Sequence, residues 1–299
     1  MRAVAAEVPP HGLVVVDAVT LPQTVCRVGL IESVLRDVTG EPVVLSMSVR
    51  ARGWVRRLAP AGWDAGTVLG SHRAAVLASR LALLGAIVRD PAVAWLTPID
   101  PLIASESKMV QYRAALRLGL RVPATAIAYD PEALAVELGA PFLLKPLGPG
   151  NFDDGSGRQL VTFATAVSPQ DLVDVDMADA PFLAQRVITA TRHLRVVTVQ
   201  GRAWTAALDA TGLPYDWRRY GPAHDAFLDS AGESDVAAAA VRLAYDLGVG
   251  YSSQDWLVDN DGAVFLDLNP GGQWLFLPAA TARPATQALA GWLVGGAPK

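Results

Sequence analysis

The chain has 299 residues, of which 52% are hydrophobic and 18% are charged. This composition excludes an intrinsically disordered protein and supplies enough apolar residues for a sizeable core. The formal net charge of −4 provides no overall cationic field that would attract nucleic acid or an anionic membrane. We therefore expect no nucleic-acid partner and no membrane partner.

The start of the chain and its cysteine content indicate the cellular compartment of the protein. Residues 1–10 lack the apolar stretch of a signal peptide, and no run reaches the roughly 18 apolar residues of a membrane-spanning helix. The single cysteine, Cys26, cannot form an internal disulfide. No Cys/His cluster has the spacing of a zinc site. These features predict a soluble, cytoplasmic protein.

The first hundred residues read as an α/β unit. Short β-branched runs predict strands at Leu13–Val16 and Val43–Leu45, and longer patterns predict helices at Ile31–Val38 and Ala74–Val88. A further strand over 92–96 runs into a loop marked by prolines. We place the first domain boundary at this loop.

The central part alternates short strands and helices around a glycine-rich stretch. A helix opens at Ser105–Lys108 and closes at Gly119, because serine caps helices and glycine ends them. The stretch Gly148–Gly157 has four glycines in ten residues. The remaining predicted elements here are strands at Val122–Ala128, Pro141–Pro146, Leu160–Phe163 and Phe182–Val187 and a helix at Pro131–Leu138.

The final third has the pattern of an antiparallel sheet. Two strands, Leu194–Val199 and Ala203–Leu208, flank a Gln-Gly turn. A second hairpin joins Ser252–Val258 to Ala263–Leu268 through the strong turn sequence Asp-Asn-Asp-Gly. The alanine-rich segment Val236–Leu247 between the hairpins predicts a helix.

The second hairpin carries a candidate metal site. Alternate residues of a strand point to the same face, so Asp267 and Asn269 share a face, and the hairpin can bring Asp255 beside them. Two carboxylates and an amide oxygen are hard ligands suited to Mg²⁺. The alternative is an edge strand whose aspartate faces solvent, followed by an Asn-Pro-Gly turn.

Lysine usage gives a second signal. Of the 25 basic residues, three are lysines, namely Lys108, Lys145 and the terminal Lys299. Lysine offers a compact charge that can touch one phosphate oxygen in a tight site, whereas arginine presents a wide fork. The glycine-rich stretch after Lys145 can present backbone N–H groups to phosphates. Two surface lysines left by chance and an ordinary mobile turn are the alternatives.

Taken in order, these pieces resemble the ATP-grasp superfamily over residues ~92–280. They are a Ser-Lys helix start, the strand Phe-Leu-Leu-Lys-Pro with its glycine-rich loop, the arginine of Leu-Arg-Val, and an aspartate followed one hairpin later by Asp-x-Asn. The resemblance implies that ATP and Mg²⁺ bind. Its nucleotide-binding positions match Lys108, Lys145, Gly150, Gln185, Arg186, Val187 and Asn269; its metal ligands match Asp255, Asp267 and Asn269; its phosphate-contacting arginine matches Arg195.

This chain departs from the family at two of these positions. The family usually has glutamate where this chain has Asp267, and the shorter carboxylate can still bind a metal. It often has an acidic residue in the strand before the adenine hinge, where this chain has Gln185. No residue of the sequence matches a ribose-binding acid.

Two further stretches resemble the microviridin-type or graspetide macrocyclases, which modify ribosomal peptides. One is Asp216-Trp-Arg218-Arg-Tyr, and the other is the Asn-Pro-Gly-Gly-Gln-Trp sequence that begins at Asn269. The resemblance implies phosphorylation of an Asp or Glu side chain of a precursor peptide and its capture by a Thr, Ser or Lys side chain. Arg218 would hold the carboxylate or acyl phosphate, and Asp216 would orient Arg218 or accept the nucleophile's proton. A structural ion pair is the alternative for Asp-Trp-Arg, and Trp274 is expected in the core or in the wall of the site.

The resemblance implies an α/β (α+β) ATP-grasp fold with three parts: an N-terminal α/β domain over 1–104, a central subdomain over 105–184 and a C-terminal antiparallel-sheet subdomain over 185–299. The first ~90 residues do not resemble the usual start of these macrocyclases. A stand-alone ligase that acts on an amino acid or a small carboxylic acid therefore stays open. So do a nucleotide- or peptide-binding protein without turnover, an α/β binding protein without nucleotide, and a homodimer.

Overall fold

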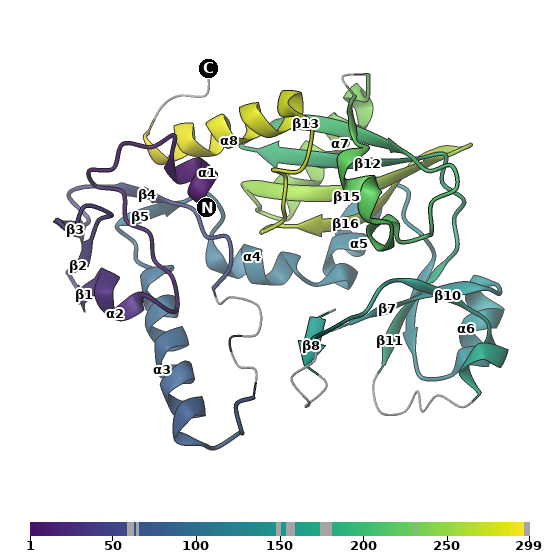
Figure 1. The fold of residues 1–299 in the computed structure, drawn as a ribbon, viewed down its shortest axis with the longest axis horizontal. Coiled ribbons are helices and arrows are strands. Elements are labelled where there is room, and N and C mark those ends of the chain that lie inside the picture. Colours follow the sequence, from purple (N-terminus) through teal and green to yellow (C-terminus); the bar gives the residue numbers. More distant parts are fainter. Residues whose placement is uncertain are drawn as a thin grey trace.

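The computed structural model describes residues 1–58, 63, 66–147, 151–153, 159–173, 181–230 and 232–295, and the side chains of these except over 151–153 and 159–161. Two antiparallel sheets dominate (Figure 1). The larger has the strand order β14-β13-β12-β15-β16. Its strands are β12 (Arg192–Val199), β13 (Arg202–Asp209), β14 (Leu228–Asp229), β15 (Tyr251–Asp259) and β16 (Gly262–Asn269).

Helices cover both faces of this larger sheet, because successive residues of its strands are apolar and point to opposite sides. On one face, Leu194 and Val196 pack with α5 (Lys108–Arg117) and α7 (Ser234–Asp246). On the other face, Val197 and Val199 pack with α8 (Ala279–Leu293). The core between the sheet and α8 includes Trp274, whose indole Nε1 donates to Thr286 Oγ1 at 2.9 Å. Trp274 is thus a core residue, one of the two positions that the sequence allows it.

The smaller sheet has the order β10-β7-β11-β6 and lies beside the larger one (Figure 1). One face packs on α6 (Pro131–Leu138), whose N-cap Asp130 accepts from the N–H groups of Glu132 and Ala133. The strands are β6 (Thr125–Ala128), β7 (Phe142–Pro146), β10 (Thr165–Val167) and β11 (Phe182–Arg186), and the hairpin β8 (Asn151–Asp153)–β9 (Gln159–Val161) follows β7. Strand β8 falls within the predicted glycine-rich stretch Gly148–Gly157, the rest of which lies outside the described residues, and β9 follows that stretch.

The N-terminal part comprises a three-stranded meander, a parallel strand pair and a long helix that projects from the body (Figure 1). Its elements are α1 (Arg2–Ala5), α2 (Leu21–Thr24), β1 (Val25–Val28), β2 (Glu32–Arg36), β3 (Pro42–Ser46), β4 (Ala51–Gly53), α3 (His72–Ile87), β5 (Val93–Trp95) and α4 (Ile99–Ser105). The helix predicted at Ala74–Val88 and the strand predicted at Val43–Leu45 are confirmed.

Two predictions in this part are wrong. The segment Ile31–Val38 contains a strand, not a helix: Ser33 and Leu35 are buried while their neighbours in β2 are more exposed, and β2 pairs with β1 and β3. Pairing in the meander outweighs the local pattern. Residues Leu13–Val16 form no strand, although the Val38 N–H donates to the Leu13 carbonyl.

The predicted α/β (α+β) class is confirmed by this mixture of helices and mostly antiparallel sheets. Both predicted hairpins of the final third are present as β12–β13 and β15–β16. In the described part of the chain, no helix is long and apolar enough to cross a membrane. The domain boundaries at 104 and 184 stay predictions.

Candidate active site

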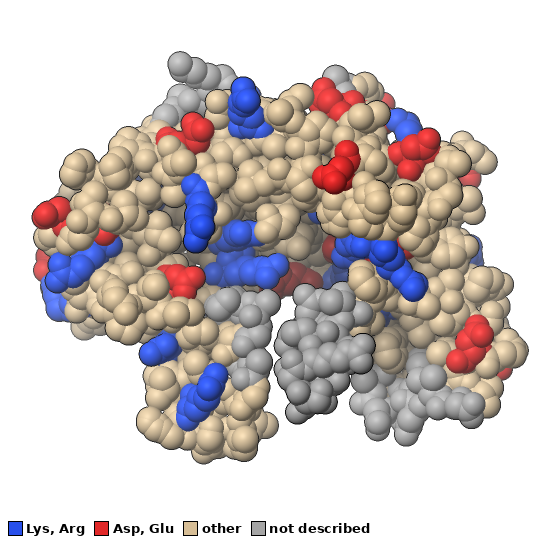
Figure 2. Space-filling view, in the orientation of Figure 1, with Lys and Arg blue, Asp and Glu red and all other residues tan. Residues whose placement is uncertain are grey.

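A cavity of about 530 Å³ collects most of the predicted site residues. Its walls come from the smaller sheet, from the larger sheet, from the start of α5 and from the loop over 210–218. In Figure 2, Lys and Arg side chains gather in the hollow at the centre of the visible face. The predicted site residues in the cavity wall are Lys108, Lys145, Gln185, Arg186, Asp216, Arg218, Asp255 and Asp267.

Lys108 and Asp267 meet although 159 positions separate them in sequence. Lys108 is the first residue of α5, and its Nζ lies 2.5 Å from Oδ1 of Asp267 on β16. Burial alone would raise the pKa of the Asp267 carboxyl, but the Lys108 ammonium outweighs it and holds the pKa below its usual value. The pair therefore places a charged lysine and a charged carboxylate at the cavity wall.

Lys145 is held by an amide instead of a carboxylate. Its Nζ donates to Gln185 Oε1 at 2.5 Å, and Gln185 Nε2 donates to Thr125 Oγ1 at 2.9 Å. Gln185 is 1% exposed. Burial, with the charge of Lys108 nearby, lowers the pKa of Lys145 to about 8. A neutral amide does not offset that effect as a carboxylate would.

Arg195 and Asp255 face each other on adjacent strands. They are register partners on β12 and β15, and Arg195 Nε lies 3.0 Å from Asp255 Oδ1. Arg195 Nη1 also donates to Ser253 Oγ at 3.0 Å. The guanidinium lies 5.8 Å from the ring centre of Trp217 and 5.6 Å from that of Phe276. Arg195 therefore supports Asp255 from a buried position behind the cavity wall.

Asp216 connects the loop that follows β13 to the segment directly before β10. Its two oxygens accept from Arg218 Nε and Nη2 at 2.7 Å each, and Oδ2 also accepts from the Ala164 N–H at 3.1 Å. Burial opposes the charge on Asp216, but the bonds from Arg218 keep its pKa low, and the same bonds raise the pKa of Arg218. Asp216 is buried, whereas the Arg218 side chain is 53% exposed. Arg218 can therefore reach a ligand while Asp216 holds it.

Two of the predicted residues that the structure describes lie apart from this group. Asn269 is exposed and is not among the lining residues; its Oδ1 accepts from the Gly271 N–H at 2.9 Å. Val187 is also outside the lining. Gly150 lies outside the described residues. Arg186 lines the cavity, but its guanidinium donates to the carbonyls of Leu138 and Glu137 at the end of α6.

The donor set at the second hairpin fits Mg²⁺ in part. Asp255 and Asp267 are register partners on β15 and β16, so two carboxylates stand side by side on the cavity wall. Carboxylate oxygens are hard ligands that suit this ion. Among the described residues no group of three or more His, Cys, Asp or Glu side chains could hold a metal. Asp255 and Asp267 would therefore hold Mg²⁺ together with oxygens that the nucleotide or water supplies.

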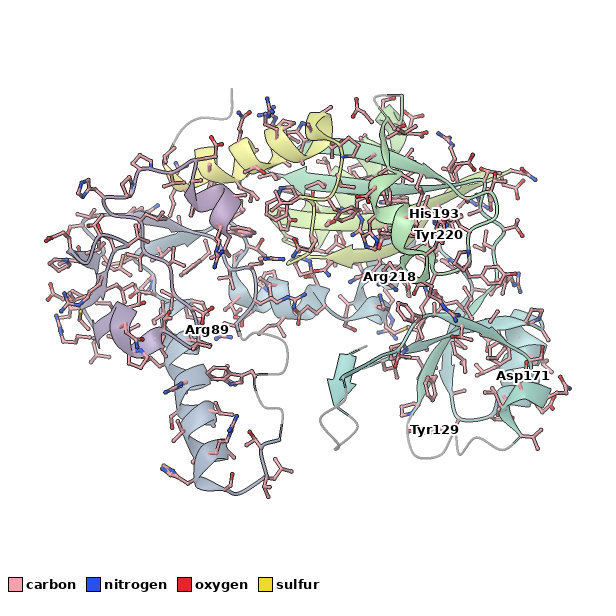
Figure 3. All side chains as sticks on the ribbon, viewed as in Figure 1. Arg89, Tyr129, Asp171, His193, Arg218 and Tyr220 are labelled. Carbon is pink, nitrogen blue, oxygen red and sulfur yellow. The ribbon has the colours of Figure 1, made fainter. Side chains whose placement is uncertain are left out.

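The sequence interpretation assigned no role to His193, which also lines the cavity. It lies on β12 two residues before Arg195, and Figure 3 shows it near Arg218 beside the larger sheet. Burial lowers the pKa of His193, against the charges of Asp255 and Asp216, which act to raise it. Its spacing from Arg195 could have identified it, because residues two apart on a strand share a face.

No protein-family model and no curated protein matches the sequence. Solved structures are similar in fold. The macrocyclase MdnC bound with precursor peptide MdnA, from Microcystis aeruginosa MRC, is 22% identical with a TM-score of 0.74, covering 94% of this chain and 90% of MdnC. A RiPP-associated ATP-grasp ligase of Chryseobacterium gregarium, in complex with ADP and a leader and core peptide, is 20% identical with a TM-score of 0.81, covering 100% and 93%.

The ATP-grasp ligase PsnB, complexed with a minimal precursor, Mg and ADP, is 18% identical with a TM-score of 0.63, covering 88% of this chain and 85% of PsnB. The match to the Chryseobacterium ligase includes the first ~90 residues, whose sequence does not resemble the usual start of these macrocyclases. The three-dimensional likeness therefore extends over the whole chain. The chain therefore has the ATP-grasp fold of these solved structures.

Proposed function

We propose that this protein is a Mg²⁺- and ATP-dependent ligase that activates a carboxylate as an acyl phosphate. The observation that carries the proposal is the convergence of Lys108, Lys145, Asp255 and Asp267 in one cavity. Two ammonium groups beside two carboxylates suit a metal-bound triphosphate, since cations neutralise phosphate oxygens and carboxylates hold Mg²⁺. The ATP-grasp fold supports this reading, because similar structures contain ADP, and one contains Mg and ADP.

The chemistry requires positive charge at the point of reaction. A substrate carboxylate oxygen attacks the γ-phosphorus, the bond to the bridging oxygen breaks, and ADP leaves. Two negatively charged groups approach each other in this step. Lys108 and Lys145 would neutralise the phosphate oxygens, and Mg²⁺, when bound, would supply further charge neutralisation. Arg195 would act through Asp255, which it holds in place.

Arg218 is the candidate clamp for the substrate carboxylate. It lies in the cavity wall, about half of its side chain is exposed, and Asp216 fixes its orientation through two hydrogen bonds. A guanidinium binds a carboxylate or an acyl phosphate in a bidentate manner. Asp216 accepts four hydrogen bonds from the protein's own groups, three of them from Arg218, so orienting Arg218 is the role that the geometry favours for it.

We further propose that the carboxylate belongs to an Asp or Glu side chain of a ribosomal precursor peptide. A hydroxyl or amine of the same peptide would attack the acyl phosphate, release phosphate and close an ester or amide ring. Structures of similar fold contain a precursor peptide or a leader and core peptide, over at least 85% of their own length. This likeness supports a peptide substrate more than a free amino acid.

Mass spectrometry of candidate peptides incubated with the protein and Mg·ATP tests the proposal. Short peptides with Thr and Asp/Glu clusters, encoded next to the gene, are the first candidates. The proposal expects the loss of one water per ring, dependent on ATP. A gain in mass equal to an added amino acid would instead support a stand-alone ligase, and ATP binding without any product would support a binding protein.

A further inference from the structure

Two arginines, Arg56 and Arg57, lie beyond the phosphate end of the proposed nucleotide cavity and are called the arginine pair below. They follow β4, and Arg56 Nε donates to the carbonyl oxygen of Gly271 at 3.3 Å. The Gly271 N–H in turn donates to Asn269 Oδ1 at 2.9 Å. Asn269 ends β16, and two residues earlier on this strand Asp267 lines the cavity. These hydrogen bonds connect the arginine pair to the strand that carries a candidate metal ligand.

The backbone of the arginine pair is fixed by its neighbours. Trp54 packs edge-to-face on Tyr251 in the core between the larger sheet and α8, with 5.5 Å between the ring centres. Val55 is buried in a different cluster, which includes residues of α4. At Gly271 a Cβ would come within 2.3 Å of the Arg56 carbonyl oxygen, so this close approach requires glycine. The two arginines therefore have a defined place beside the loop that follows β16.

The guanidinium groups of the arginine pair keep N–H donors for a ligand. Arg56 uses its Nε for the Gly271 carbonyl, and its terminal nitrogens make no hydrogen bond within the described residues. Arg57 is exposed and, within the same residues, forms neither a hydrogen bond nor an ion pair. Burial raises the pKa of the Glu106 carboxyl at the end of α4, and the charge of Arg57 acts to lower it. Two arginines beside this glutamate leave an excess of positive charge that suits an anionic ligand.

The direction of the proposed reaction indicates what this anion is. In phosphoryl transfer the attacking and the leaving oxygen lie roughly in line with the phosphorus. ADP would fill the cavity up to Asp255 and Asp267, so the substrate carboxylate has to approach from beyond these two residues. Asn269 lies about 7 Å further along β16 than Asp267, because alternate residues of a strand have that spacing. The arginine pair follows Asn269 and therefore lies on the substrate side of the site.

Arg218 and the arginine pair differ in their distance from the reacting phosphate. Arg218 lines the cavity together with Asp255 and Asp267, so it can reach the carboxylate that attacks. The arginine pair is not among the lining residues. A carboxylate at the arginine pair is therefore a different one from the carboxylate that Arg218 holds.

We propose that the arginine pair binds a second carboxylate of the precursor peptide, close to the activated Asp or Glu side chain but not itself activated. The pair would thereby select peptides in which acidic residues are clustered. This inference rests on the proposed function and names a specificity-determining contact of the same site. Terminal guanidinium N–H groups bind both oxygens of a carboxylate. At a partly exposed position, loss of such a contact is expected to raise KM by about three- to tenfold.

A double-mutant cycle between the protein and its peptide tests the inference. The probe is a peptide that the protein cyclises in the mass-spectrometric test, and each glutamate or aspartate outside the first ring formed is changed in turn to its amide. With at least one such amide peptide, the wild type is expected to show a KM about three- to tenfold higher and a kcat within about threefold. Arg57→Gln is expected to raise KM for the original peptide by the same factor, with no further rise for that amide peptide.

Three further variants complete the design. Arg57→Lys keeps the charge and is expected to restore part of the discrimination between the two peptides. Arg56→Gln is expected to act in the same direction as Arg57→Gln, and thermal unfolding checks that it is folded. Arg50→Gln is the control, since Arg50 is exposed directly before β4, and its KM is expected to match the wild type within about twofold.

Several results would overturn the inference. They are equal wild-type KM values for the original and every amide peptide, efficient cyclisation of a peptide with a single acidic residue, and independent, additive effects in the cycle. A fall in kcat at unchanged KM in Arg57→Gln would also overturn it and assign the arginine pair to the activated carboxylate. Normal cyclisation without discrimination contradicts the arginine pair alone, whereas a protein that cyclises no peptide contradicts the proposed function and this inference with it.

Discussion

Arg195 and Asp255 are register partners on the two central strands of the larger sheet, and 3.0 Å separates Arg195 Nε from Asp255 Oδ1. The rings of Trp217 and Phe276 lie on the guanidinium and leave it little freedom to move. Asp255 in turn stands beside Asp267 on the next strand. The positions of the candidate metal ligands thus depend on an arginine that does not itself line the cavity.

The first prediction concerns this pair. Arg195→Ala is expected to lower the rate of ADP release by about a hundredfold or more, because an unsupported Asp255 no longer presents its carboxylate to the site. The measurement is peptide-dependent ADP release at saturating Mg·ATP. Arg202→Ala is the control, because Arg202 lies on the same sheet over the ring of Trp204 and outside the cavity lining. A rate within threefold of wild type in Arg195→Ala would contradict the role given to Arg195.

The second prediction tests the phosphate and metal assignments. Asp267→Ala and Lys145→Ala are each expected to abolish ADP release, because each removes a charge at the reacting phosphates. Asp259→Ala is the matched control. Asp259 lies on the same hairpin as Asp267 but outside the cavity lining, and it forms an ion pair with Arg121. This ion pair is partly exposed to solvent and lies away from the cavity, so the control should stay folded and active. Near-normal turnover in either test variant would remove its residue from the site.

The third prediction follows from the lowered pKa of Lys145. With a pKa of about 8, the Lys145 amine is about half protonated at pH 8, whereas a bound phosphate requires the ammonium. Binding of Mg·ATP at pH 8 should therefore take up about half a proton, and affinity should fall as the pH rises above 8. Calorimetry in buffers of different ionisation enthalpy measures the uptake.

Gln185→Glu is the companion variant for this measurement. It places a carboxylate at the position that now accepts from Lys145 Nζ, which raises the pKa of the ammonium and moves the loss of affinity to higher pH. Proton uptake at pH 8 should become smaller than in the wild type. An unchanged uptake would show that another group is responsible.

The fourth prediction separates substrate binding from nucleotide binding. Arg218→Ala is expected to leave Mg·ATP affinity within about threefold of wild type and to stop ligation, because Arg218 is assigned to the substrate carboxylate. Arg219→Ala is the neighbouring control; Arg219 lies over the ring of Phe163 and is not among the lining residues. Loss of ATP affinity in Arg218→Ala would assign this arginine to the nucleotide instead.

The fifth prediction concerns stability. A Cβ at Gly250 would overlap the carbonyl oxygen of Leu96, whereas a Cβ at Gly291 in α8 meets nothing within 4 Å. Gly250→Ala should therefore lower the melting temperature, and Gly291→Ala should raise the free energy of unfolding by about 0.5–1 kcal/mol. Thermal unfolding of both variants checks the pair. The opposite order of melting temperatures would contradict the packing at Gly250.

Local signals predicted much of the fold. The helix at Pro131–Leu138 is confirmed at both ends, because Asp130 caps its start and Gly139 follows its end. The turn between β12 and β13 is confirmed at Gln200 and Gly201, which both have positive φ. The helix predicted over Ile31–Val38 is wrong, because partners distant in sequence decide the structure of that segment.

Those residues of the candidate site whose type is unusual in this chain were predictable from the sequence. Lys108 and Lys145 stand out in a chain that otherwise uses arginine, and both line the cavity with Asp255 and Asp267. His193 shows no comparable signal, because a single histidine in an apolar strand forms no recognisable motif with its neighbours in the sequence. Its significance depends on the cavity, which strands and loops from both sheets form.

Transfer of a labelled oxygen tests the central claim most directly. A substrate peptide whose Asp and Glu carboxylates carry oxygen-18 would be incubated with the protein and Mg·ATP, and the released phosphate analysed by mass spectrometry. An acyl phosphate leaves one carboxylate oxygen on phosphorus when the ring closes, so we predict one oxygen-18 in the phosphate for each ring formed. Unlabelled phosphate, or label recovered in AMP, would contradict carboxylate activation by the γ-phosphoryl group.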